Sequence, residues 1–460
     1  MVIIFMLVRL AVLVAFGALH WYAWRRLVRD TTRLGSLQRR AGTIVFVAGP
    51  LLTGGALVAE NPWVPFWLEQ FLSWPGYLWM VLFLYLLLAL LAGEAVRPLL
   101  RRWLARRDAG TDRQERAHPS GRPVSGRPGE PGAPRGEELV AVGRPRSLTE
   151  EPGVSGGARD MPEAVAVDEH PRAPEPGLSS TRPTGPSRRL FVSRVVGGAA
   201  AAVSVGTVGY GTYGVLRGPK VKRLTIPLAR LPRSAHGFRI AVVSDIHLGP
   251  VLGRGFAQRV VDTINATQPD LIAVVGDLVD GSVEDLGPAV QPLAQLRARH
   301  GAYFVTGNHE YFSGYAEQWV EKVRDLGLNP LENARTELPG FDLAGVNDIR
   351  GESEGQGPDF TKALGGRDRS RAAVLLAHQP IVIHDAVRHG VDLQLSGHTH
   401  GGQLWPGNLI AELANPTLAG LERYGDTQLY VSRGAGAWGP PVRVGAPSDI
   451  TVVELASKQA

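Results

Sequence analysis

Five short polar motifs in the second half of this 460-residue chain each directly follow a run of apolar residues. They are SDIH at 244–247, GDLVDG at 276–281, GNHE at 307–310, AHQP at 377–380 and GHTHGG at 397–402. A short apolar run that ends in polar residues is typical of a buried strand leading into a loop. Because open α/β sheets bind ligands at the carboxyl ends of their strands, we expect these loops to converge on one site.

Strand and helix signals alternate at the start of this region. The predicted strands are 238–244, 271–275 and 303–306, and the predicted helices are 255–266, 286–299 and 315–325. This alternation predicts parallel strands joined by helical crossovers. Later segments are richer in strands, which we predict at 341–345, 372–377, 393–395, 429–432 and 450–455. Periodicity alone therefore predicts an α/β fold.

The order of the five motifs, D-x-H, G-D-x-x-D, G-N-H-[D/E], a lone His and G-H-x-H, resembles the calcineurin-like metallophosphoesterase family. One such motif occurs by chance in many proteins, but five in this order at strand ends are specific. The resemblance covers roughly 237–455 and implies two packed mixed β-sheets flanked by helices. The run YVSRGAGAWGPPVRVGAP at 430–447 is similar to the closing segment of a membrane-associated bacterial branch of that family.

The resemblance also implies a binuclear metal centre. One metal would be held by Asp245, His247 and His400, the other by Asn308, His378 and His398, and Asp277 would bridge them. These ligand types suit Mn²⁺, Fe or Zn²⁺, and the chain has no cysteine that could supply a thiolate. Two cations about 3.5–4 Å apart acidify a shared water to hydroxide and neutralise phosphoryl charge. The implied role of His309 is to stabilise or protonate the leaving oxygen.

Further polar residues near the motifs are weaker candidates. Asp280 and Glu310 are predicted to orient the ligands. Three arginines, Arg254, Arg433 and Arg443, are either phosphate-binding groups or solvated surface residues, because a guanidinium matches phosphate oxygens in geometry.

The positive charge of the chain lies mainly outside this region. The formal net charge is +6, and residues 1–107 hold twelve Arg but four acidic residues, so the remainder is slightly acidic. We therefore expect no nucleic-acid partner.

Three apolar segments precede the motifs, at 2–24, 41–59 and 75–96, and are candidate membrane spans. A cleaved signal peptide is the alternative for the first, but no small-residue cleavage site follows it. The loop at 25–40 carries six Arg and 97–107 carries five, whereas 60–74 has no Lys or Arg. By the positive-inside rule the basic loops are cytoplasmic, and the amino terminus is outside.

The segments between the membrane domain (1–107) and the catalytic domain (236–457) have distinct compositions. Residues 108–186 are rich in Pro, Gly and charge, which predicts a disordered linker. In 187–216, two arginines precede an apolar run, which is either a fourth transmembrane helix or a signal anchor for the twin-arginine export machinery. Both alternatives put the following residues outside the cytoplasm, where 217–235 is predicted to be a tether.

We predict a multi-pass protein of the cell membrane with an extracytoplasmic, binuclear metal-dependent phosphoesterase. It would hydrolyse a phosphomonoester or phosphodiester, and a lipid or cell-envelope precursor is a candidate substrate. The alternative is a metal-dependent binding or sensor module that holds a phosphorylated ligand without turnover. A transporter is less favoured because the candidate membrane spans are few and contain few charged residues. His309 favours the enzyme, since a binder needs no leaving-group acid.

Overall fold

The computed structural model describes residues 2–61, 63–116 and 188–459. The described residues up to 101 and from 188 onward form one compact unit, to which 102–116 do not belong. Helix α3 (Phe66–Arg116) continues into residues that we predicted to be linker, and the predicted linker from 117 onward lies outside the described residues.

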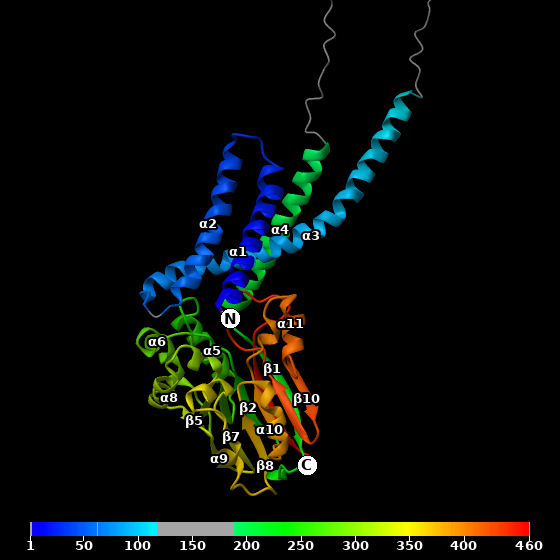
Figure 1. Cartoon of the computed structure of the whole chain (residues 1–460). Coiled ribbons are helices and arrows are strands. Elements are labelled where there is room, and N and C mark those ends of the chain that lie inside the picture. Colours follow the sequence, from blue (N-terminus) through cyan, green and yellow to red (C-terminus); the bar gives the residue numbers. More distant parts are fainter. Residues whose placement is uncertain (1, 62, 117–187, 460) are drawn as a thin grey trace, which may run out of the picture. The chain divides into compact units, whose positions relative to one another are not determined.

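Among the residues that the structure describes, four helices are long and apolar enough to cross a membrane. They are α1 (Val2–Trp24), which continues as a π-helical turn at Arg25–Arg29, α2 (Leu37–Ala59), α3 and α4 (Arg188–Leu216), as Figure 1 shows. Helices α2 and α3 begin before the predicted apolar runs because helical hydrogen bonding extends through the preceding residues, 37–40 and 66–74. Ser36, for example, caps α2 by accepting a hydrogen bond from the backbone N–H of Arg39.

Helices α3 and α4 also pack against the carboxyl-terminal part of the chain. Val81 and Tyr85 of α3 form an apolar cluster with Val208 of α4 and with Val442. The Tyr85 hydroxyl donates a hydrogen bond of 2.8 Å to the backbone carbonyl of Trp405. These contacts join two of the apolar helices to the loop that holds Trp405 and to the loop that holds Val442.

The carboxyl-terminal half contains two six-stranded mixed sheets, in the orders β1-β12-β2-β3-β4-β5 and β10-β11-β9-β8-β7-β6. The strands of the first sheet are β1 (Lys220–Leu228), β2 (Phe238–Val243), β3 (Leu271–Val275), β4 (Ala302–Val305), β5 (Asn329–Pro330) and β12 (Asp449–Ser457). Those of the second are β6 (Ala334–Leu338), β7 (Phe341–Gly345), β8 (Ala372–Leu376), β9 (Leu393–Ser396), β10 (Gly420–Tyr424) and β11 (Thr427–Val431).

Both faces of the central strands are buried, which explains their continuous apolar sequences. In β2, Ile240 and Val242 face the core between the two sheets, while Ala241 and Val243 face the helices. The helices that cover the sheets are α5 (Arg254–Ala266), α6 (Val283–Val290) and α8 (Ala316–Asp325) on the first, and α9 (Phe360–Leu364) and α10 (Ile383–Arg388) on the second. The predicted architecture of two mixed sheets flanked by helices is confirmed.

Several local predictions were wrong. The segment at 217–235 is no free tether, because β1 pairs in parallel with β12 along its whole length. Exposed residues alternate with the buried Ile226 and Leu228, which is the pattern of a half-buried edge strand and not of the predicted tether. The predicted helix at 286–299 starts earlier and changes to a 3₁₀ turn at Gln291–Gln295. Strands β6 and β10 and helix α11 (Gly407–Ala414) were not predicted.

The topology brings the motif-bearing loops together. Strands β2, β3 and β4 are mutually parallel, as are β8 and β9, so their carboxyl ends lie at one edge of each sheet. The two edges are joined directly, since the His378 ring Nδ1 lies 2.9 Å from the backbone carbonyl of Val275. Loops from both sheets therefore meet at one site, as the motif positions predicted.

Candidate metal centre

Five candidate ligands have a backbone conformation that non-glycine residues rarely adopt. Asp245, His247, Asp277, His398 and His400 all have φ between 47° and 75°. Of the residues that the structure describes, three other non-glycine residues have positive φ. This left-handed conformation turns the chain sharply at the end of each strand and costs of the order of 1–3 kcal/mol per residue. Such strain is typical of functional sites, where surrounding structure holds the backbone in place.

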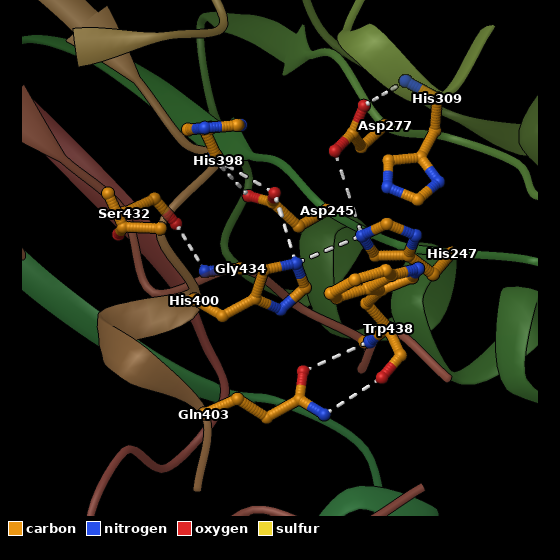
Figure 2. Close-up of polar contacts among 12 residues, drawn as sticks. Asp245, His247, Asp277, His309, His398, His400, Gln403, Ser432, Gly434 and Trp438 are labelled. Atoms are coloured by element: carbon orange, nitrogen blue, oxygen red, sulfur yellow. Dashed lines mark hydrogen bonds and ion pairs between the residues drawn. The ribbon is translucent and has the colours of Figure 1, made fainter. Parts of the chain in front are cut away.

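The first group of ligand atoms comes from the loops after β2 and β9. Asp245, His247 and His400 offer a carboxylate oxygen and two ring nitrogens that lie within 4.8 Å of one another. The Nε2 atoms of His247 and His400 lie 3.0 Å apart, and Oδ1 of Asp245 lies 3.4 Å from Nε2 of His400. Figure 2 shows both contacts. Two converging imidazole nitrogens beside a buried carboxylate are suited to a shared cation.

The second group comes from the loops after β4, β8 and β9. Oδ1 of Asn308 lies 3.1 Å from Nε2 of His378 and 2.8 Å from Nδ1 of His398. The Nδ1–H of His378 donates to the Val275 carbonyl, which leaves its Nε2 directed at the site. Burial, followed by the charge of His378, lowers the pKa of His398 to about 4, so its ring is neutral and able to bind metal at pH 7.

Asp277 lies between the two groups. One carboxylate oxygen accepts a hydrogen bond of 2.9 Å from the His309 backbone N–H. The other lies 3.0 Å from Nε2 of His378 and 3.8 Å from Nε2 of His247. Burial opposes ionisation of Asp277, but the neighbouring histidines, His378 foremost, hold its pKa well below the usual range. A carboxylate in this position can bind a cation on each side.

The donor set fits two divalent cations. Asp245 and Asp277 are buried, and the structure brings all seven predicted ligands to one place. Burial lowers the pKa of His378, but the negative charge of Asp277 overcomes this effect and raises it well above its usual value. The centre thus attracts positive charge, and oxygen and imidazole donors without thiolate suit Mn²⁺, Fe or Zn²⁺.

His309 lies at the mouth of this centre. Its Nδ1 is 2.8 Å from Oδ1 of Asp280, which also accepts from Nδ1 of His247 at 2.8 Å. Burial lowers the pKa of His309, but the hydrogen bond and charge of Asp280 more than offset this and raise it to about 9. His309 also offers a nitrogen within 4.8 Å of ligand atoms of His247 and Asp277, so the geometry is compatible with a ligand as well as an acid.

Two acidic residues, Asp280 and Glu310, contact a candidate ligand or the loops that carry the candidate ligands. Asp280 holds the His247 ring so that its Nε2 faces the site. The Glu310 carboxylate accepts hydrogen bonds from the backbone N–H groups of Asp277, Leu278 and Gly307. Glu310 therefore ties the loop after β3 to the loop after β4.

The role of Arg443 was not predicted. It is 6% exposed, so it is no solvated surface residue, and its N–H groups are directed at protein atoms. They lie at the backbone carbonyls of Gly436 (2.6 Å) and His400 (3.0 Å) and at Nδ1 of His400 (3.0 Å). Arg443 thus positions His400. By contrast, Arg254 is exposed at the start of α5 and Arg433 is half-buried.

The fold and the centre define an α/β protein with a binuclear-type metal site and a set of apolar helices. Residues 238–402 match the family described as calcineurin-like phosphoesterase. A transmembrane protein with metallophosphoesterase domain from Danio rerio is 41% identical over 264 residues, which cover 55% of this chain and 60% of that protein. An uncharacterized metallophosphoesterase from Aquifex aeolicus is 34% identical over 244 residues, which cover 52% of this chain and 92% of that protein.

The chain belongs to the calcineurin-like metallophosphoesterase family. An uncharacterized metallophosphoesterase from Helicobacter pylori strain J99 is likewise 39% identical over 251 residues, covering 54% of this chain and 67% of that protein. The chain spans about three fifths of the length of the Danio rerio relative.

We expect Gly307→Ala to reduce bound metal by at least half. A Cβ at this position would collide with the Asp277 carboxylate, its Cγ lying 2.9 Å away, and the bridging group would have to move. Gly366→Ala is the matched control, because nothing lies within 4 Å of the added Cβ. Elemental analysis of the purified full-length proteins measures the difference. Wild-type metal content in Gly307→Ala would show that the position of Asp277 does not govern metal binding.

Proposed function

We propose that this chain is a metal-dependent phosphoesterase that hydrolyses a phosphomonoester or phosphodiester at the outer face of the cell membrane. The observation that supports it most strongly is the position of Asp277, whose carboxylate lies between Asp245, His247 and His400 on one side and Asn308, His378 and His398 on the other. Two divalent cations bound in such a centre acidify water and neutralise charge on the phosphoryl oxygens.

The residues around the metals have separate tasks in this proposal. Asp245 and Asp277 supply the negative charge that the cations need, and Asp280 and Arg443 orient His247 and His400. His309 donates a proton to the oxygen that leaves phosphorus. Its raised pKa keeps it protonated at neutral pH, and bound cations would lower that pKa towards the range in which a general acid works best.

We expect His309→Ala to retain its metal and to slow hydrolysis of an alkyl phosphate ester by about 10²–10⁴-fold, because an alkoxide needs a proton to leave. The rate on a nitrophenyl ester should fall much less, since nitrophenolate leaves without one. Asp277→Asn serves as the contrasting variant and should lose metal and both activities. Turnover with each ester and metal content of each variant are measured.

Loss of metal in His309→Ala, or equal slowing of both esters, would contradict the acid role and would make His309 a ligand. A wild-type protein that binds metal and both esters without any turnover would instead support the binding or sensor alternative.

The orientation in the membrane is part of the proposal. Glu60, Asn61 and Val64, in the α2–α3 connection, line a cavity of about 360 Å³ together with His247 and Asp280. This connection belongs to the one inter-helix loop without Lys or Arg, which the positive-inside rule puts outside. The contact and the charge pattern thus support the same side for the metal centre.

A reporter that is active only outside the cytoplasm tests this orientation. We expect activity when it is fused after Ala460 and none when it is inserted near Gly143, because α4 separates the two positions. The opposite pattern would refute the orientation and leave the hydrolytic proposal intact.

A further inference from the structure

A second and larger cavity, of about 1130 Å³, opens beside the metal centre. Its polar wall includes Asp277, His398 and His400 of the centre itself, with His309 at the edge. Its apolar walls come from Met80 and Leu84 on α3, from Ile410 on α11 and from Trp438. A phosphate at the metals would therefore have an apolar space next to it.

The α3 wall belongs to a helix of membrane-spanning length. Met80 and Leu84 are four residues apart, so their side chains share one face of α3. The hydrogen bond from Tyr85 to the carbonyl of Trp405 fixes the loop before α11 against that helix. The cavity thus extends from the metal centre to a helix of membrane-spanning length.

The other apolar wall, α11, exposes large hydrophobic side chains. Ile410 is 73% exposed and Leu413 is 89% exposed, with Leu409 and Trp405 nearby at 56% and 51%. A contiguous apolar surface of this kind on a short helix is typical of contact with a membrane interface. Since α11 lies beside α3, the interface and the cavity would be continuous.

We propose that the substrate is a membrane-lipid phosphoester whose phosphate binds at the metal centre and whose alkyl chain occupies the cavity between α3 and α11. This inference rests on the proposed phosphoesterase function. Small soluble phosphoesters would leave the apolar walls in contact with water. Each methylene of an alkyl chain that enters the cavity can increase binding by up to about fourfold. In the reaction, water adds its oxygen to phosphorus, the ester P–O bond breaks and the leaving oxygen takes a proton.

Chain-length dependence tests the inference with the full-length protein in detergent micelles. Two series are used, alkyl phosphates and 4-nitrophenyl alkyl phosphates, each with methyl, butyl and octyl chains. We expect kcat/KM to rise at least tenfold from methyl to octyl in one series. Equal values across both series would overturn the lipid inference and leave the phosphoesterase proposal standing, whereas no metal-dependent turnover of any ester would contradict the phosphoesterase proposal itself.

A pair of variants on α11 separates the cavity from general membrane contact. Ile410 lines the cavity, whereas Leu413 on the same helix does not. Ile410→Asn should lower the ratio of kcat/KM for the octyl ester to kcat/KM for the methyl ester at least fivefold. Leu413→Asn should leave this ratio unchanged. Equal effects of the two variants on the ratio, or an unchanged ratio in Ile410→Asn, would overturn the assignment. Metal content and the circular-dichroism spectrum verify that each variant is folded.

Discussion

The buried carboxylate of Asp277 is the interaction on which the metal centre depends. It contacts histidines from both sheets and accepts a hydrogen bond from the backbone of the β4 loop. An ionised carboxylate without positive partners would be strongly unfavourable in this environment. The surrounding histidines lower its pKa, and two cations would stabilise the charge further. The arrangement of loops at the edge of the two sheets therefore follows from the need to surround this one group.

The sheets also make the strained loop conformations possible. Five ligand residues with left-handed backbones cost of the order of 5–15 kcal/mol together, taking 1–3 kcal/mol for each. Each ligand loop follows a buried strand whose apolar side chains pack on both faces of the sheet, and this strand holds the start of the loop in place. Within the loops themselves, the side chains of Glu310 and Arg443 form hydrogen bonds with backbone groups. This rigid support allows the ligands to keep positions that the free chain would not adopt.

The sequence predicted those parts of the molecule that depend on local pattern. Strands β2, β3 and β8 were predicted within about one residue, because their apolar runs end at polar motifs. Strand β1 was missed because its pattern is that of an edge strand and its partner β12 lies more than 200 residues away. The role of Arg443 was missed for a similar reason, since its contact with His400 depends on how distant loops pack.

The contact between the apolar helices and the metal centre could not be predicted from local pattern either. Met80 and Leu84 are ordinary apolar residues of a membrane-length helix in the sequence, and only the fold brings them to the cavity at the centre. The same holds for Glu60 and Asn61, which line the smaller cavity of about 360 Å³. This packing links the candidate metal centre to helices of membrane-spanning length and explains why these helices and the two sheets belong to one compact unit.

Electron paramagnetic resonance of the Mn²⁺-loaded protein tests the central claim, that Asp277 bridges two metal ions, most directly. Two Mn²⁺ ions joined by a carboxylate are magnetically coupled and give a multiline spectrum that differs from that of isolated Mn²⁺. We expect this coupled spectrum at two metals per chain in the wild-type protein and its loss in Asp277→Asn. A wild-type protein that binds two Mn²⁺ ions but shows only uncoupled signals, or an Asp277→Asn variant that keeps the coupled spectrum, would contradict it.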